Sequence, residues 1–492
     1  MLVLLVLTAC TSSPPAEKDS WTFGDDSTPV DDSATNDDTS TPPPPDDSDT
    51  PPDDSTTIPG DFAITGLDAE VNETIGSIIE VSWNQNEPST GYVAYRFEPS
   101  LPTDDWMESP TKTWDAGPHD EILLGIPYGS MVTWRVVSDP DGDEPERSTA
   151  DETIDNDPLP TGCPEPSVLV SDRVGMDPSV KYLLGTNNEG SSGLGAARFW
   201  AFILDRDARV VWALRPPSNR MFFQIKPSYD GDELLVDYNS FWAIYDNGEA
   251  SQIARVKIDG SVVDVTDTPG LHHGFTETAD HAYLWPAYQN HPIDEWLLEK
   301  DASGVQRTVF KCEDFHDSIG ASDYCGSNNV YWDPNTDTVY YSFFWSDTVV
   351  HIDRKSGEPI RWFGRLPGAY AFDPPESQFW LQHDAHLNDD GTLIVSSHTT
   401  QDAYENVARV YTIDEANETL HLQETFGEGD GIYGQYIGEA WKLPSGNFLQ
   451  NYGTNGRVRE GTADGTIVWD MQWSGNFMGR TLGLSDLYVF AP

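Results

Sequence analysis

One short stretch combines three side chains that can do chemistry: Gln382-His383-Asp384, in a segment from Phe379 to Leu387 that is expected to form a strand. A neutral imidazole is a good nucleophile near pH 7, and covalent catalysis divides one difficult group transfer into two easier steps. An amide, an imidazole and a carboxylate at the head of a strand need a shared cavity in which they meet water, ligand or one another. We therefore expect His383 to line a cavity.

Polar residues stand at the corresponding place in several other units of similar length. The units recur roughly every 50–55 residues, and in each the polar residue lies a few positions before a turn. The five strand heads are Gln224, His273, Asn329, Asp384 and Glu439. A period near 50 with several strands per unit is typical of a β-propeller blade. Closure of the ring would gather these heads around one central channel.

The elements that position these residues are therefore expected to be the blades of a six-bladed β-propeller over residues 160–492. Five blades come from the repeat, and one comes from the residues around Phe199 to Leu214. We expect the final Leu487–Phe490 to pair into the first blade, because closure removes exposed edge strands. The predicted fold class is all-β, which an aromatic content of 12% also favours.

Residues 60–157 are expected to form a separate unit. Alternating strands are predicted at Ile78–Trp83, Thr90–Phe97, Glu121–Ile126 and Met131–Val137. Short strands at about 10-residue spacing predict a β-sandwich of the fibronectin type III or immunoglobulin kind, as a spacer or as the interface of a homodimer. The acidic turn Asp139–Asp143 is interpreted as a plain turn rather than a calcium site, because the other ligands of an EF-hand are missing.

The first residues predict export and anchoring. Residues 1–10 form a short apolar run that ends in Leu7-Thr8-Ala9-Cys10, which resembles the lipobox of bacterial lipoproteins, in which the cysteine is lipidated. Residues 11–59 are rich in Ser, Thr, Pro and Asp and predict a disordered linker. We expect an exported lipoprotein of the outer membrane, periplasm or cell surface, in contact with the membrane through its lipid anchor only.

Charge and cysteine usage narrow the expected partners and cofactors. A formal net charge of −56 opposes binding to nucleic acid, so no nucleic-acid partner is expected. Cys312 and Cys325 bracket a short loop and are expected to form a disulfide if the chain is exported, although their spacing alone does not establish the pair. A zinc site is not expected without CxxC pairing, and no cofactor is expected.

Several stretches between Leu271 and Trp473 together resemble the bacterial arylsulfate sulfotransferase family. They are Leu271-His272-His273-Gly274, Tyr331 to Phe363 with its Ile352-Asp353-Arg354-Lys355-Ser356-Gly357 and Arg361-Trp362-Phe363-Gly364, Gln382-His383-Asp384-Ala385, and Leu443-Pro444-Ser445-Gly446-Asn447. The resemblance implies a six-bladed propeller preceded by a small β-domain. It also implies transfer of a sulfuryl group from an aryl sulfate to a phenol through a sulfohistidine, without a nucleotide sulfate donor or a metal.

The resemblance carries roles to particular residues. His383 matches the family's nucleophile, and Asp384 is expected to orient its imidazole or the neighbouring backbone. His272 and His273 match a histidine that binds a sulfate oxygen or protonates the leaving phenoxide, and His273 is preferred because it aligns with the other strand heads. The other substrate-binding candidates are Asn329, Phe344 and Trp380, of which the aromatic members suit stacking on a ring.

Two positions depart from the family pattern. The chain has Gly326 where the family has a second histidine, and Phe344 where the family has an arginine. Each loss removes a donor for sulfuryl oxygens that is worth a few kcal/mol, by order of magnitude, in the transition state. The candidates to replace these donors are His316, His398 and Arg480.

Two functions follow from these observations. The first is an arylsulfotransferase-like enzyme that acts on a small aromatic sulfate ester and a phenol, with His383 as the nucleophile and His273 assisting. The second is a non-catalytic, surface-anchored propeller that serves as a binding module after losing part of the family's anion-binding site.

Overall fold

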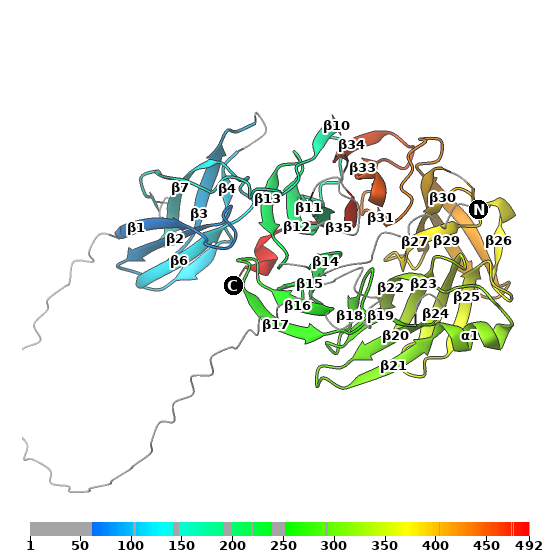
Figure 1. The fold of residues 1–492 in the computed structure, drawn as a ribbon. Helices are drawn as coiled ribbons and strands as arrows, with labels where there is room; N and C mark the ends of the chain where they lie inside the picture. The colour runs from blue at the N-terminus through cyan, green and yellow to red at the C-terminus, as the bar shows by residue number, and fades with distance from the viewer. Residues whose placement is uncertain are drawn as a thin grey trace, which may run out of the picture. The chain divides into compact units, whose positions relative to one another are not determined.

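The computed structural model describes residues 62–101, 105–140, 147–189, 199–217, 220–238, 251–290, 294–402, 404–473, 475 and 477–491, and this part of the chain is all-β with few helical segments (Figure 1). The helical segments are α1 (Cys312–Ile319), η2 (Pro375–Ser377), η3 (Gly453–Asn455) and η4 (Tyr488–Phe490). Within the described ranges, no helix has the length and apolar composition that crossing a bilayer requires. Cys10, the predicted signal peptide, the predicted linker and most of the acidic turn at Asp139–Asp143 lie outside the described residues.

Two antiparallel sheets form the N-terminal region. One contains β1 (Ile64–Val71), β2 (Ile79–Gln85) and β6 (Gly117–Leu123). The other contains β3 (Ser89–Glu98), β4 (Met107–Glu108), β5 (Lys112–Trp114), β7 (Met131–Asp139), β8 (Arg147–Ser148) and β9 (Glu152–Asp155). Alternate residues of β2 are buried, and Val81 and Trp83 pack with Tyr95 and Trp134 of the other sheet in one core. The predicted strands overlap β2, β3, β6 and β7, but β6 begins at Gly117 rather than at Glu121.

Beyond residue 160, the described residues form six sheets of four or five strands (Figure 1). The first sheet has the order β13 (Val210–Leu214), β12 (Phe199–Asp205), β11 (Tyr182–Asn188) and β35 (Met478–Leu484). The second has β14 (Ile225–Pro227), β15 (Leu234–Tyr238), β16 (Gln252–Val256) and β17 (Val262–Asp267). The third has β18 (Thr276–Glu277), β19 (Tyr283–Asn290), β20 (Asp294–Lys300) and β21 (Gln306–Lys311).

The other three sheets follow in chain order. The fourth has β22 (Ser327–Asp333), β23 (Thr338–Phe343), β24 (Thr348–Asp353) and β25 (Pro359–Gly364). The fifth has β27 (Trp380–Leu387), β28 (Leu393–His398), β29 (Asn406–Asp414), β30 (Thr419–Phe426) and, parallel to β30, β26 (Ala371–Asp373). The sixth has β31 (Glu439–Lys442), β32 (Phe448–Asn451), β33 (Arg457–Gly461), β34 (Ile467–Gln472) and β10 (Ser167–Ser171).

Burial within a sheet falls from its inner strands to its outer strand. Every residue of β28 is buried, and its first half, Leu393–Val395, is an apolar run, as expected of a strand that is covered on both faces. In contrast, Val262 and Val263 of the outer strand β17 are exposed. The cores lie between neighbouring sheets: Val349 of β24, for example, packs with Val395 of β28.

The predicted closing strand at Leu487–Phe490 is wrong, because this segment contains the turn η4. Asp486 accepts a hydrogen bond from the backbone N–H of Tyr488 (3.0 Å), which favours a turn, and the Tyr488 hydroxyl lies 3.1 Å from that of Tyr95 in the N-terminal region. The strand that joins the first sheet is instead β35, which pairs with β11 along its length. Two pairings, β11 with β35 and β10 with β34, therefore join the beginning of this region to its end.

Candidate functional site

Strand heads that are far apart in the sequence meet at one place. Strand β22 contacts β27, β27 contacts β31, β31 contacts β35, and β35 contacts β14. Between β14 and β18, the side-chain oxygen of Gln224 accepts the backbone N–H of Phe275 (2.7 Å). Between β22 and β27, Asn329 Nδ2 donates to Asp384 Oδ1 (2.7 Å). Three predicted strand heads, Gln224, Asn329 and Asp384, thus form hydrogen bonds between neighbouring inner strands. A fourth, Glu439, lies close to Arg480 of β35.

An irregularity in β27 sets the direction of His383. The register with β28 shifts between Trp380 and Asp384, and Leu381 has a positive φ of 50°. The backbone N–H of Leu381 donates to Asp347 Oδ1 (2.7 Å), which holds this conformation. Simple alternation of side chains along a strand therefore does not apply here.

The imidazole of His383 is buried and held by one backbone group. Its Nδ1 lies 3.1 Å from the carbonyl oxygen of Leu381. A carbonyl oxygen only accepts, so Nδ1 carries the proton and Nε2 carries the lone pair. Among the described residues, no hydrogen bond to Nε2 is formed. The ring is 6% exposed and has Phe344 at 4.6 Å and Tyr436 at 6.1 Å between ring centroids.

His383 is neutral near pH 7. Burial holds the pKa of His383 well below 6.5, and unfavourable electrostatic interactions with His398, His273 and Arg480 act in the same direction. His398 is itself buried, and its Nε2 lies 3.3 Å from the carbonyl oxygen of Gly434. The three groups that act on His383 come from different strands or loops, which indicates that they lie around one site.

The neighbours of His383 in the sequence have other partners. Gln382 is fully buried, and its Nε2 donates to the carbonyl oxygens of Phe343 (2.9 Å) and Thr348 (3.1 Å), which ties β27 to the preceding sheet. Asp384 accepts a hydrogen bond from His386 Nδ1 (3.0 Å) rather than from His383. The expectation that Asp384 orients the imidazole of His383 is therefore not met, because the irregularity at Leu381 separates the directions of the two side chains.

His273, rather than His272, faces the site. The two Nδ1 atoms are 2.7 Å apart, so one ring donates to the other, and the backbone of His273 has a positive φ of 60°. His272 is fully buried and stacks on Tyr288 with ring centroids 3.7 Å apart. Burial and the charge of Arg480 lower the pKa of His273 to about 3, so this ring is also neutral near pH 7. His272 therefore lies behind His273 and supports it.

A cationic group of the site comes from β35. Arg480 is buried, its Nη1 donates to the carbonyl oxygen of Gly438 (3.3 Å), and its Nη2 donates to that of Asn328. Arg480 Nη1 also lies 3.7 Å from Glu439 Oε1. Burial raises the pKa of Glu439 to about 7, although Arg480 acts in the opposite direction. The sequence placed Arg480 among the replacement candidates only by its residue type.

Lys226 of β14 is a second cation that the sequence reasoning missed. Its ammonium donates to the carbonyl oxygen of Phe275 and to Thr276 Oγ1, both at 3.3 Å. Burial lowers its pKa to about 8, against the raising effects of Glu439 and Glu277. The sequence could have indicated Lys226, because it lies two residues after the strand head Gln224 and residues two apart on a strand point to the same side.

The two departures from the family pattern have different structural settings. Gly326 has a positive φ of 56°, and a Cβ atom there would lie 1.8 Å from Cδ1 of Trp345, so a histidine cannot replace it without moving that ring. Phe344 is buried, and its ring lies against that of His383. Trp380 pairs in register with His398 between β27 and β28, and His316 belongs to a separate cluster described below.

Two further features lie apart from His383. The predicted disulfide between Cys312 and Cys325 is confirmed, and Cys163 is buried with a free thiol.

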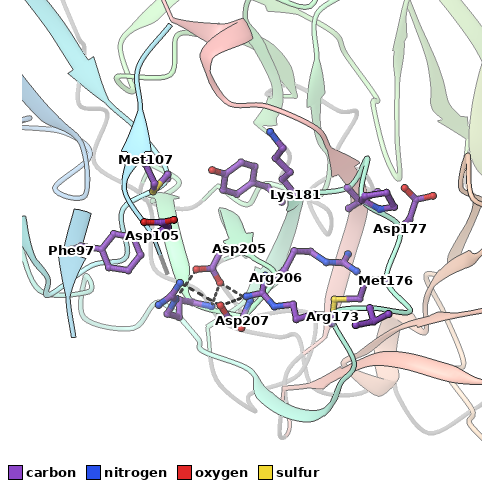
Figure 2. A pocket seen from close by; sticks show the side chains of 16 residues that line it. Phe97, Asp105, Met107, Arg173, Met176, Asp177, Lys181, Asp205, Arg206 and Asp207 are labelled. Atoms are coloured by element: carbon purple, nitrogen blue, oxygen red, sulfur yellow. Dashed lines mark hydrogen bonds and ion pairs between the residues drawn. The ribbon is translucent and has the colours of Figure 1, made fainter. Parts of the chain in front are cut away.

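A pocket of about 460 Å³ is lined by residues of β3 and β12, with Arg173, Arg206 and Asp207 among them (Figure 2). Its charges compensate one another, since Arg173 pairs with Asp207 and Arg206 pairs with Glu460.

Comparisons with solved structures show only distant likenesses. Virginiamycin B lyase from Staphylococcus aureus shares 11% identity, covers 62% of this chain and 88% of its own, and superposes with a TM-score of 0.36. A protein described as a 6-phosphogluconolactonase from Bacteroides uniformis shares 11% identity, covers 80% and 99% of the two chains, and has a TM-score of 0.37. Likenesses at this level say nothing about the activity of this chain.

Comparison with protein families gives a more specific result. No curated protein matches this chain. The family model described as arylsulfotransferase (ASST) matches residues 301–474. The matched segment contains β22, β27 and β31, and with them His383 and Phe344. Over these residues, the chain is similar to the arylsulfotransferase family.

Proposed function

We propose that this protein transfers a sulfuryl group from an aryl sulfate to a phenol, with His383 Nε2 as the nucleophile. The observation that carries the proposal is the hydrogen bond from His383 Nδ1 to the Leu381 carbonyl oxygen. It fixes the tautomer with the lone pair on Nε2, and the low pKa keeps the ring neutral. On this proposal, the six sheets beyond residue 160 are the blades of a six-bladed β-propeller, and the two N-terminal sheets form a β-sandwich.

The proposed reaction has two displacement steps. In the first, Nε2 attacks the sulfur, the bond between sulfur and the aryl oxygen breaks, and the aryloxide leaves. The sulfohistidine ring then carries a positive charge, which the Leu381 carbonyl oxygen stabilises through Nδ1–H. In the second step, the oxygen of the acceptor phenol attacks the sulfur, the bond between sulfur and Nε2 breaks, and the phenolic proton passes to solvent.

The sulfuryl oxygens need donors, and this chain supplies them from positions other than those of the family. Arg480 and Lys226 bring positive charge to the site from β35 and β14. His273 is neutral, so its role in this proposal is to donate a hydrogen bond to a sulfuryl oxygen rather than to protonate the leaving phenoxide. Phe344 and Tyr436 flank His383 and are suited to packing on the aryl ring.

The test is turnover of 4-nitrophenyl sulfate in the presence of a phenol. We expect release of 4-nitrophenolate, a sulfated phenol, and, when the acceptor is omitted, a sulfuryl adduct on His383 by peptide mass spectrometry. His383→Gln should lower kcat by at least about 1,000-fold, whereas His119→Gln on β6 should leave it unchanged. Full turnover by His383→Gln would contradict the proposal.

A second candidate function is a binding module without catalysis. The low exposure of His383 and the contact with Phe344 favour it, because they leave little free surface at the nucleophile. In this case, 4-nitrophenyl sulfate and phenols would bind with a measurable heat, but no adduct and no turnover would appear. The lipid anchor at Cys10, the exported location and a homodimer remain proposals for either function.

A further inference from the structure

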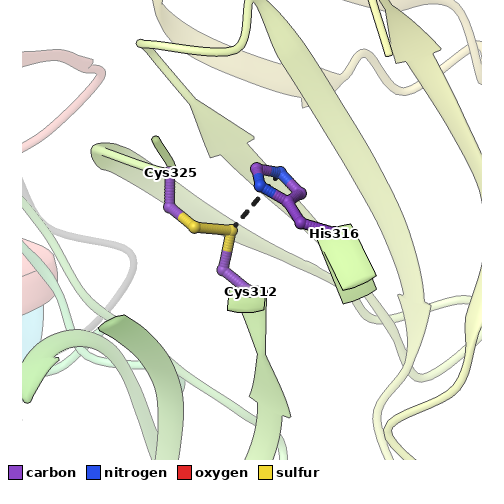
Figure 3. Close-up of side chains that lie close together, drawn as sticks. All are labelled: Cys312, His316 and Cys325. Carbon is purple, nitrogen blue, oxygen red and sulfur yellow. Dashed lines mark hydrogen bonds between the residues drawn. A yellow bond between two sulfur atoms is a disulfide. The ribbon is translucent and has the colours of Figure 1, made fainter. Parts of the chain in front are cut away.

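Three side chains that ligate soft metals lie together at the two ends of one loop (Figure 3). Cys312 is the first residue of α1, His316 lies one turn later on the same helix, and Cys325 precedes Gly326. All three are buried, with exposures of 0%, 4% and 1%. Their ligand atoms lie within 4.8 Å of one another. The expectation from the sequence was that no zinc site exists, because the chain has no CxxC spacing.

The imidazole of His316 is already in the tautomer that a metal ligand needs. Its Nδ1 lies 2.9 Å from the carbonyl oxygen of Asp323, so Nδ1 carries the proton. The lone pair of Nε2 therefore points toward the sulfurs, at 3.6 Å from Cys312 Sγ. A backbone carbonyl that holds the remote nitrogen is the usual support of a metal-bound histidine.

The distance of 3.6 Å between Cys312 Sγ and His316 Nε2 agrees with tetrahedral coordination. With zinc bonds of about 2.3 Å to sulfur and about 2.05 Å to nitrogen, a tetrahedral centre places the sulfur and the nitrogen about 3.6 Å apart. The two sulfurs of such a centre are about 3.8 Å apart, which is the separation of two thiolates rather than of a disulfide. In the oxidised form the sulfurs are bonded to each other, so the disulfide must open before the site exists.

We infer that reduction converts this disulfide into a site for one Zn²⁺ ion held by Cys312, Cys325 and His316. A phosphine reductant and one water molecule give the phosphine oxide and two thiols. Binding of Zn²⁺ then releases the two thiol protons and leaves a neutral dithiolate complex with the imidazole. A water molecule completes the tetrahedron, as in other sites with two cysteines and one histidine.

The site adjoins the region around His383. The backbone carbonyl oxygen of Cys325 accepts a hydrogen bond from the backbone N–H of Trp345 (3.3 Å). The carbonyl oxygen of Gly326 accepts one from the backbone N–H of Phe344 (2.9 Å). Three residues after Cys325, the carbonyl oxygen of Asn328 accepts a hydrogen bond from Arg480 Nη2. The same short segment therefore carries one end of the metal site and the residues that shape the candidate active site.

The inference can be tested on the full chain with Zn²⁺ alone as the probe. The protein is reduced with a water-soluble phosphine, separated from it under argon, and titrated with Zn²⁺ or Co²⁺. We expect one Zn²⁺ per chain in the reduced form, none in the oxidised form, release of two protons, and with Co²⁺ the intense visible bands of tetrahedral thiolate coordination. Cys163→Ser should leave these results unchanged, because Cys163 lies outside the cluster.

Ligand variants and a folding readout make the test decisive. His316→Gln should weaken zinc binding by at least about tenfold, and Cys312→Ser should abolish the thiolate bands. Zn²⁺ should raise the thermal midpoint of the reduced protein, or restore its near-UV circular dichroism if reduction unfolds it. Zinc uptake that is absent, equal in His316→Gln, or without effect on the fold of the reduced chain would overturn the inference.

Discussion

Arg480 donates through Nη2 to the carbonyl oxygen of Asn328, although the two residues are 152 positions apart in the sequence. Arg480 lies on β35 in the first sheet, and Asn328 lies on β22 in the fourth. The same guanidinium reaches Gly438 beside β31 through Nη1 (3.3 Å). One buried side chain therefore links three sheets at the site of His383.

Replacement of Arg480 should reduce both stability and activity. Arg480→Gln leaves the carboxyl group of Glu439 buried without its cation, and loss of one partner of a buried pair typically costs about 3–5 kcal/mol. Urea denaturation should show this loss in the free energy of unfolding, together with a lower kcat/KM for 4-nitrophenyl sulfate. Lys355→Gln is the control, because Lys355 is 83% exposed and its pair with Asp337 should contribute less than about 1 kcal/mol.

The pH dependence of catalysis should reflect a neutral His383. Its pKa lies well below 6.5, so the fraction of nucleophilic imidazole stays near one as the pH falls from 8 toward 6.5. The acidic limb of kcat/KM should therefore have its midpoint clearly below pH 6.5, since this parameter reports ionisation of the free enzyme. A midpoint at or above pH 6.5 would show that His383 is solvated like an ordinary histidine.

Restoring the family's residue should have different effects at Gly326 and at Phe344. Gly326→His places a side chain at a positive φ and against the Trp345 ring, and it should lower the free energy of unfolding by about 2 kcal/mol or more. Phe344→Arg should fold and should raise kcat/KM for aryl sulfates, because a cation beside His383 stabilises the transferring group. Phe344→Leu, which changes size without adding charge, separates the effect of the cation from that of extra space.

Mild acid should destabilise the fold through its buried histidines. The pKa is lowered in the folded state for five of them, which are His273, His316, His351, His383 and His398. Below pH 6.5 the unfolded chain binds protons that the folded chain does not, so stability is complete above pH 6.5 and declines as the pH falls toward 4. Each such histidine adds a slope of up to about 1.4 kcal/mol per pH unit.

Urea midpoints measured between pH 7.5 and 4.5 check this expectation. His351→Gln should reduce the slope, because burial lowers the pKa of His351 to about 4. A midpoint that is constant over this pH range would contradict the predicted burial of neutral histidines.

Sequence patterns predicted the strands of this chain better than their long-range partners. Apolar alternation located strands such as β2 and β7, because side-chain burial in a sheet has a period of two. Strand β35 was not predicted from the sequence, because Gly479 and Gly483 interrupt its apolar pattern. A Cβ atom at Gly479 would lie 2.0 Å from Thr186 Oγ1 on β11, so close packing of the two strands, rather than hydropathy, determined that residue.

The candidate site was predictable to the extent that it depends on strand position. The heads of the repeated units include His273 and Asn329, and His383 directly precedes the head Asp384, so the repeat placed these residues near one another. The direction of Asp384 was not predictable, because it depends on the positive φ of Leu381 and its bond to Asp347. The role of Arg480 was not predictable either, because it depends on the pairing of β35 with a strand about 300 residues away.

The pairing of β11 with β35 has a consequence for the order in which the molecule folds. The second to fifth sheets consist of strands that are near one another in the chain, so they can form early and locally. The first sheet is incomplete until its last strand returns, as the pair Asn187 and Met478, 291 residues apart, illustrates. A molecule arrested just before that return has nearly all of its strands in place, but Arg480 is still far from Asn328. Such a molecule would pass most spectroscopic tests of native structure, but its site would be incomplete, so activity would report completion of the first sheet.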